Sequence, residues 1–201
     1  MARVSLHCPS TLIVARHGEA EYPHHVDLVS DEGGRLTARG REQAAGLAAS
    51  LTDRRVAIVY TSTRARAVET GGIAARALGV AARELAGLEE FSVGDLAGAR
   101  FDDPRLTSTY AGWLAGELAH RIPGAESGQE LVARFRDALS TIADLHRGET
   151  VLVISHGGVM SLGLPRVALG GPAGPPPPLA NCAQVELSAG DDGWRLGPWP
   201  S

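Results

Sequence analysis

The sequence predicts an α/β fold, a three-layer α/β/α sandwich with a mostly parallel central sheet. Three short apolar runs rich in β-branched residues have the length of buried strands: "TLIVA" (11–15), "VAIVY" (56–60) and "TVLVIS" (150–155). Segments with helical periodicity separate these runs along the chain. Strands that alternate with helices form parallel sheets in which both faces are covered.

The first two helices are predicted over 36–51 and 64–79, one on each side of the second apolar run. In the first, the apolar residues share one helical stripe, and Thr37 suits the N-cap position. In the second, Gly79 is the expected C-terminal stop, because glycine adopts the left-handed conformation that ends many helices.

The clearest helix is predicted over 127–148, just before the third apolar run. Ser127 and Glu130 form an S-x-x-E capping box at its start, and Gly148 is expected to end it. Its apolar residues recur at helical spacing: Leu131, Phe135, Leu139, Ile142 and Leu145.

The C-terminal part is predicted to hold one more helix, a loop and a final strand. The helix falls within 156–171, with Pro165 as a kink or break. The proline run 172–178 forms a loop, and "AQVELS" (183–188) is a short final strand. Because there is no repeat and no linker, we expect residues 1–201 to form one domain.

Composition excludes several classes of function. The 201 residues are 44% hydrophobic and 21% charged with a net charge of -4, so no global field attracts nucleic acid or an anionic membrane. No apolar run approaches the roughly 20 residues of a membrane span. Cys8 and Cys182 are far apart and suggest neither a disulfide framework nor a metal site. We expect a cytoplasmic protein.

Basic side chains follow all three predicted strands. Arg16 and His17 follow the first, Arg64 and Arg66 follow the second, and His156 with Gly157 follows the third. The carboxyl ends of parallel strands share one edge of the sheet, which is where such folds bind ligands. We therefore expect these residues to meet at one site.

This set of residues suits a phosphoryl group. Arginine presents a planar fork of donors to phosphate oxygens, and a neutral histidine can attack phosphorus. The backbone N–H groups of Gly157 and Gly158 at a helix start would face an anion. A leaving alkoxide needs a proton, and the segment 87–98 offers Glu89, Glu90 and Asp95 as donors.

Six segments then carry a family resemblance, and they appear in the family's order: "ARHGE" (15–19), "LTARGREQAAGLAASL" (36–51), "TSTRARAVET" (61–70), "LEEFSVGDLAG" (88–98), "GAESGQELVARF" (124–135) and "ISHGGVM" (154–160). Together they resemble the histidine phosphatase superfamily, the phosphoglycerate-mutase-like proteins, over about residues 10–190. Their register selects Arg66 over Arg64 and Glu90 over its neighbours.

The resemblance implies a mechanism and a phosphoglycerate-mutase-like fold. His17 attacks phosphorus and becomes phosphohistidine, while Glu90 protonates the leaving oxygen. Arg16, Arg66 and His156 hold the phosphoryl oxygens, with Gly157 as a further phosphate-binding residue. The family requires no metal and no other cofactor for this chemistry.

We expect the protein to be a phosphatase that hydrolyses small phosphorylated metabolites. Glycolytic mutases carry tryptophan and asparagine where Tyr22 and Pro23 stand here, and they have a longer insertion over the site. Here the cover segment, residues 97–124, is short and should admit water. A phosphoglycerate-type mutase is the alternative, and a non-catalytic module that binds phosphorylated ligands is a third reading. Relatives are commonly dimers, so this chain could also form a homodimer.

Several residues keep more than one interpretation. His24 and His25 are expected on the surface, with substrate contact at the pocket rim as the alternative. Arg64 is expected to be solvated at the start of its helix, with contact to a longer anionic substrate as the alternative. Glu19 is expected to be structural, with substrate binding as the alternative. The cover segment contains aromatic and apolar residues at helical spacing that are expected to be core, with a binding shelf as the alternative: Tyr110, Trp113 and Leu114.

Overall fold

The computed structural model describes residues 8–21, 34–172 and 174–200. The strands in these ranges are β1 (Ser10–Arg16), β2 (Ala20–Glu21), β3 (Arg35–Leu36), β4 (Val56–Thr61), β5 (Ala81–Glu84), β6 (Thr150–Ser155), β7 (Gln184–Gly190) and β8 (Gly193–Leu196). The helices are α1 (Ala38–Ala49), α2 (Ala65–Leu78), α3 (Pro104–Ala115), α4 (Gly128–Leu145) and α5 (Gly157–Val167), with short 3-10 turns η1 (Thr52–Arg54) and η2 (Gly94–Leu96).

The main sheet is mostly parallel, as the sequence predicts. Within the described ranges it has six strands in the order β5-β4-β6-β1-β7-β8, and β2 pairs with β3 in a separate antiparallel ribbon. The pairs β5–β4, β4–β6 and β6–β1 are parallel, whereas β7 is antiparallel to both β1 and β8. The strand β1 therefore lies inside the sheet, paired on both sides.

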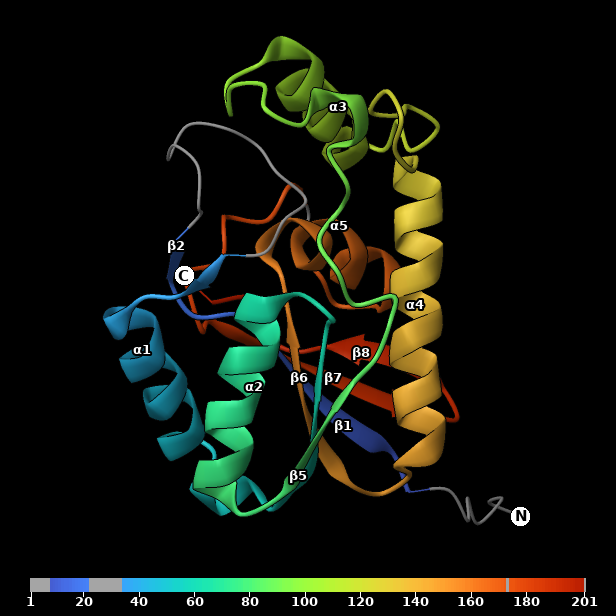
Figure 1. The fold of residues 1–201 in the computed structure, drawn as a ribbon. Helices are drawn as coiled ribbons and strands as arrows, with labels where there is room; N and C mark the ends of the chain where they lie inside the picture. The colour runs from blue at the N-terminus through green and yellow to red at the C-terminus, as the bar shows by residue number, and fades with distance from the viewer. Residues whose placement is uncertain (1–7, 22–33, 173, 201) are drawn as a thin grey trace, which may run out of the picture.

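Helices cover both faces of this sheet, which confirms the three-layer sandwich (Figure 1). Successive side chains of a strand point to opposite faces. Leu12 and Val14 of β1 accordingly belong to the hydrophobic cluster that includes α4 and α5. Ile13 and Ala15 belong to the second cluster, which includes α1 and α2.

The sheet register brings the ends of the three predicted strands together. Arg16 at the end of β1 is in register with Ser155 at the end of β6, and Thr61 of β4 is in register with Ile154. The residues that follow these strands are His17, Ser62 and His156. They emerge side by side at one edge of the sheet.

The predicted helix signals are confirmed at three termini. Thr37 caps α1, and its side chain accepts a hydrogen bond from the N–H of Gly40. Gly79 ends α2 with a φ of 71°, in the left-handed region that disfavours other residues. Ser127 and Glu130 form both hydrogen bonds of the capping box at the start of α4.

Two helices end earlier than predicted. The helix α1 begins at Ala38, directly after its predicted cap Thr37, but it ends at Ala49 rather than at Leu51. The helix α4 ends at Leu145 rather than at Gly148. Leu145 is consequently 66% exposed and does not extend the buried stripe to which it was assigned.

The C-terminal prediction also needs two corrections. Pro165 does not break α5, because it lies in the last turn and the helix continues to Val167. The strand over 183–188 is not the last, because β8 follows it and pairs with it. The described residues of the proline run form neither helix nor strand, as predicted.

The cover segment contains α3 and packs on the end of the sandwich beside α4 and α5 (Figure 1). Trp113 of α3 is 0% exposed, and its indole N–H donates to the carbonyl of His120 at 2.7 Å. Arg166 of α5 donates to the carbonyls of Trp113 and Leu114 at 2.6 and 3.1 Å. The cover is thus tied to α5 at the C-terminal end of α3.

We expect Ser127→Ala to lower the free energy of unfolding by about 1 kcal/mol, because it removes the cap of α4. Urea denaturation followed by circular dichroism measures this change. The control is Ser108→Ala, which removes an exposed hydroxyl that bonds to Pro104 inside α3. The control should change stability by less than about 0.5 kcal/mol. Equal effects of the two substitutions would contradict the role assigned to the cap.

Candidate active site

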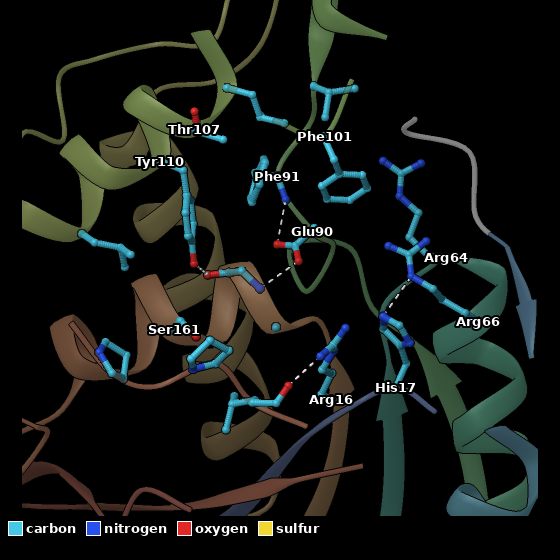
Figure 2. Close-up of a pocket in the computed structure, with 18 residues that line it drawn as sticks. Arg16, His17, Arg64, Arg66, Glu90, Phe91, Phe101, Thr107, Tyr110 and Ser161 are labelled. Atoms are coloured by element: carbon cyan, nitrogen blue, oxygen red, sulfur yellow. Dashed lines mark hydrogen bonds between the residues drawn. The ribbon is translucent and has the colours of Figure 1, made fainter. Parts of the chain in front are cut away.

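A cavity of about 410 Å³ opens at the edge where β1, β4 and β6 end. Arg16 closes β1, His17 follows it, and Arg66 lies in the first turn of α2. Glu90 comes from the loop between β5 and η2, and all four side chains line this cavity (Figure 2). The structure therefore brings together residues that are up to 74 positions apart, since 90 - 16 = 74.

His17 is 5% exposed and is held at both ring nitrogens. Its Nδ1 lies 2.7 Å from the carbonyl oxygen of Gly18, which can only accept, so we assign the hydrogen to Nδ1. Arg66 donates from Nε to Nε2 of His17 at 3.1 Å (Figure 2). The ring is therefore neutral, and its Nε2 lone pair faces the guanidinium in the cavity.

The electrostatic surroundings keep His17 neutral. Burial lowers the pKa of His17 to about 3, and the positive charges of Arg66 and Arg16 act in the same direction. The hydrogen bond to Gly18 opposes them only in part. At neutral pH the imidazole is thus an uncharged base, and its Nε2 electron pair accepts from Arg66.

His156 is fully buried and packs against His17, with the two ring centroids 5.1 Å apart. Its Nε2 lies 2.7 Å from Oγ of Ser62, whereas its buried Nδ1 has no hydrogen-bond partner in the part of the chain that the structure describes. Burial, and then the charge of Arg66, hold the pKa of His156 well below its usual value. It lies beside the cavity rather than among its lining residues.

Arg16 reaches across the floor of the cavity. Its terminal nitrogen donates to the carbonyl of Leu179 at 2.6 Å (Figure 2). Its buried Nε has no hydrogen-bond partner among the described residues. A Cβ atom on Gly157 would lie 3.3 Å from that Nε, so the glycine leaves room for the guanidinium beside the start of α5.

Glu90 occupies the N-terminus of α5. One carboxylate oxygen accepts from the N–H of Gly158 at 2.8 Å (Figure 2), and the other accepts from the N–H of Val159 at 2.7 Å. The expectation that the Gly158 N–H faces an external anion is thus wrong, because this N–H already binds a carboxylate of the chain. Burial raises the pKa of Glu90, although these N–H groups and the charge of Arg66 act to lower it.

A salt bridge fixes the loop that carries Glu90. Arg134 of α4 donates to the carboxylate of Glu126 at 2.7 and 2.6 Å. The same guanidinium donates to the carbonyls of Gly87, Glu89 and Glu90. The segment "GAESGQELVARF" therefore supports the loop 87–98 that carries Glu90, which we call the acidic loop.

The other candidate carboxylates have different positions. Glu89 accepts from the Thr63 hydroxyl at 2.8 Å and from the Gly87 N–H at 2.7 Å, which closes its own turn. Asp95 is exposed, and neither residue lines the cavity. Glu90 is the carboxylate among the three that lines it.

Sequence reasoning missed three residues that hold the machinery in place. Ser62 binds His156, and Asn181 donates to the carbonyl of His17 at 3.1 Å. Thr70 accepts from the Gly18 N–H at 3.1 Å and donates to the carbonyl of Arg66 at 2.7 Å. Ser62 and Thr70 lie within the quoted "TSTRARAVET" segment, which was a usable signal, whereas Asn181 lies in no motif.

The remaining interpretations have mixed outcomes. Glu19 accepts from the hydroxyl of Thr37 at 2.8 Å, which fits the structural role expected of it. Arg64 is half-buried and lines the cavity, so it is not simply solvated. Tyr110 and Leu114 also line the cavity, and of the three residues expected to be core only Trp113 is buried. Tyr22, Pro23, His24 and His25 lie outside the described residues.

The described residues offer neither a metal site nor a membrane-spanning helix. They contain no cluster of three or more histidine, cysteine, aspartate or glutamate side chains placed to hold a metal ion. Within the same ranges, no helix has the length and apolar character needed to cross a membrane.

Comparison with known proteins places this geometry in a family. The family model described as "Histidine phosphatase superfamily (branch 1)" matches residues 12–200. This range includes all the residues that line the cavity. The family match therefore agrees with the resemblance read from the six motifs.

Individual relatives carry different names. The probable phosphoglycerate mutase GpmB of Salmonella choleraesuis is 30% identical over 193 residues, covering 92% of this chain and 88% of the relative. The metal-independent phosphoserine phosphatase of Arabidopsis thaliana is 29% identical, covering 94% and 80%. The fold is similar to that of the mycobacterial glucosyl-3-phosphoglycerate phosphatase, with a TM-score of 0.79, 22% identity and coverage of 95% and 99%.

We expect the two buried imidazoles to make the folded state less stable in mild acid. The unfolded chain takes up protons near the ordinary pKa of 6.5, whereas folded His17 stays neutral down to about 3. The contribution of the neutral His17 ring to stability is therefore fully present above the pKa of the unfolded chain's histidine. It is lost as the pH falls below that pKa. His17→Asn should reduce the loss between about pH 7 and pH 5.5 by about 1 kcal/mol.

Urea denaturation at the two pH values measures this difference for wild type and variant. Equal m-values will show that the comparison refers to the same unfolding reaction. An unchanged pH dependence in His17→Asn would contradict the buried neutral state.

Proposed function

The chain belongs to the histidine phosphatase superfamily, and from this membership we propose that it is a metal-independent phosphomonoesterase that works through a phosphohistidine at His17. Members of the superfamily are phosphatases or mutases. The observation that carries the proposal is the neutral His17, with its Nε2 electron pair in a cavity that also holds three guanidinium groups and Glu90.

In the first proposed step, Nε2 of His17 attacks the phosphorus of the monoester. The bond between phosphorus and nitrogen forms as the bond to the leaving oxygen breaks, and protonated Glu90 gives its proton to that oxygen. The raised pKa of Glu90 supports this role, because it favours the protonated carboxyl. The alcohol then leaves the cavity.

In the second proposed step, water hydrolyses the phosphohistidine. Glu90, now a carboxylate, takes a proton from the attacking water, whose oxygen forms the new bond to phosphorus. The bond between phosphorus and Nε2 breaks, which restores neutral His17 and releases inorganic phosphate. The Nδ1 hydrogen bond to Gly18 keeps the ring in one orientation through both steps.

Positive charge and fixed donors stabilise the phosphoryl oxygens in this proposal. Arg66 turns its guanidinium from Nε2 of His17 to the phosphoryl group, and Arg16 offers the buried Nε that has no partner in the described chain. If Nε2 of His156 accepts from the Ser62 hydroxyl, its Nδ1 carries a hydrogen for the same group. Gly157 completes the phosphate-binding set by making room for Arg16.

We favour hydrolysis over mutase chemistry, although several 30% identical relatives from Salmonella are named probable phosphoglycerate mutases. A mutase must return the phosphoryl group to its product before water reaches the phosphohistidine. The short cover segment supports access of water. The relative named as a metal-independent phosphoserine phosphatase supports hydrolysis without a metal. We further propose a small phosphorylated metabolite as substrate and the cytoplasm as the setting.

We expect the purified protein to release inorganic phosphate from phosphomonoesters in the presence of EDTA. His17→Ala should abolish this turnover, because it removes the attacking nitrogen. A panel that includes 3-phosphoglycerate, assayed for free phosphate and for isomer formation, measures both reactions. Isomer formation without phosphate release would support the mutase instead. Turnover that survives His17→Ala would refute the phosphohistidine, and a folded protein that binds but never turns over would support the binding module.

We expect Glu90→Gln to slow hydrolysis of alkyl phosphates by roughly 100-fold or more, because general acid catalysis contributes factors of that size. The loss should be smaller for 4-nitrophenyl phosphate, whose leaving group needs no proton. In wild type, kcat/KM for alkyl esters should fall as the pH rises through the raised pKa of Glu90.

The matched control is Asp95→Asn, which changes an exposed carboxylate outside the cavity lining. It should keep activity within about threefold of wild type. An equal loss for alkyl and nitrophenyl esters in Glu90→Gln would argue against proton donation by this residue.

A further inference from the structure

The wall of the cavity opposite the phosphate-binding residues is apolar. Figure 2 shows Phe91 and Phe101 above Glu90 and Tyr110 to its left, with His17 and Arg16 below. These side chains and their neighbours come from the acidic loop and the cover segment: Phe91, Val93, Phe101, Leu106, Tyr110 and Leu114. We call these six residues the apolar wall.

Part of the apolar wall is a rigid aromatic cluster. Phe91 stacks on Tyr110 with ring centroids 5.3 Å apart, and it meets Trp113 edge-on at 5.7 Å. Trp113 is itself fixed by its hydrogen bond to His120. Tyr110 is held from the other end by donation of its hydroxyl to the carbonyl of Gly158 at 3.2 Å. The cluster therefore presents a surface that is formed before any ligand binds.

Phe101 completes the apolar wall in a different way. It lines the cavity but is 60% exposed, which makes it one of few large apolar side chains with that exposure in the described chain. Exposing an aromatic ring to water is unfavourable, and covering it with an apolar group recovers free energy. Because Phe101 lines the cavity, an apolar group of a bound ligand can shield its ring from water.

Charge is distributed unevenly around the cavity. The charged side chains among its described lining residues are Arg16, Arg64, Arg66 and Glu90, whereas the apolar wall contains none. A carboxylate or a sugar on that side would lose water and meet mainly ring and aliphatic carbons. Burying such groups without partners is unfavourable.

We propose that the substrate is a phosphomonoester of an apolar alcohol with an aromatic body, which lies against the apolar wall while its phosphoryl group faces His17. This inference rests on the proposed function and specifies its substrate class. It assigns Phe101 and Tyr110 as specificity-determining residues. Small polar esters such as phosphoserine and 3-phosphoglycerate fill the phosphate end alone and leave the apolar wall uncovered.

The first test compares 2-phenylethyl phosphate with ethyl phosphate. Both esters release primary alcohols of similar acidity, so the two alcohols leave about equally easily. A difference in kcat/KM therefore reports contact of the protein with the phenyl ring. We expect a preference of at least tenfold for the phenylethyl ester, and a similar preference over 3-phosphoglycerate. Hydrolysis of these esters with a smaller preference would overturn the inference and leave the proposed function intact.

The second test uses substitutions of exposed residues that should not unfold the protein. Phe101→Ala should reduce the preference at least threefold, and Phe101→Leu should restore part of it. Leu145→Ala is the matched control, because Leu145 is 66% exposed and lies outside the cavity lining. An unchanged preference in Phe101→Ala would overturn the role of Phe101.

A binding measurement separates the inference from catalysis. Calorimetry compares 3-phenylpropylphosphonate with propylphosphonate, which resemble the two esters but cannot release an alcohol. We expect at least tenfold tighter binding of the phenyl compound, even in His17→Ala. Such a preference without hydrolysis of any ester would refute the proposed function and support the apolar wall, whereas equal binding would overturn the inference.

Discussion

The burial of His17 beside two guanidinium groups is the constraint on which the rest of the site depends. A charged imidazole at this position would lose its hydration and face positive charge, so the ring stays neutral. The carbonyl of Gly18 then decides which nitrogen carries the hydrogen. The sheet supplies the required burial, since β1 is paired on both sides and ends directly before this residue. Fold and proposed nucleophile are thus linked by one desolvated ring.

Glu90 depends on a second set of contacts, which join three distant parts of the chain. The start of α5 binds its carboxylate, and a Cβ atom at Gly158 would lie 2.6 Å from one of its oxygens. Arg134 holds the backbone of the same loop from α4. Because the carboxylate and the loop are held separately, the acidic group keeps its place at the cavity without a contact to His17.

Much of this arrangement could be predicted from the sequence, because strong local signals specify it. The apolar runs and the capping box at Ser127 identified the strands and α4 without tertiary information. The residues alone could not separate Glu90 from Glu89, and only the family register did so. Asn181 was missed because its bond to His17 joins positions 164 residues apart. The short strand β8 was missed because "GWRL" has no apolar run of its own.

The carboxylate at the start of α5 has a consequence for how a substrate prepares the enzyme. Glu90 and the guanidinium groups line one cavity, so a phosphoryl dianion that binds there brings negative charge close to the carboxylate. Like charges disfavour ionisation, and the dianion also offsets the arginine charges that favour it. Binding is therefore coupled to proton uptake at Glu90. In the proposed mechanism, the bound substrate thus favours the protonated form of the acid that its own leaving group needs, and the departure of phosphate removes this effect.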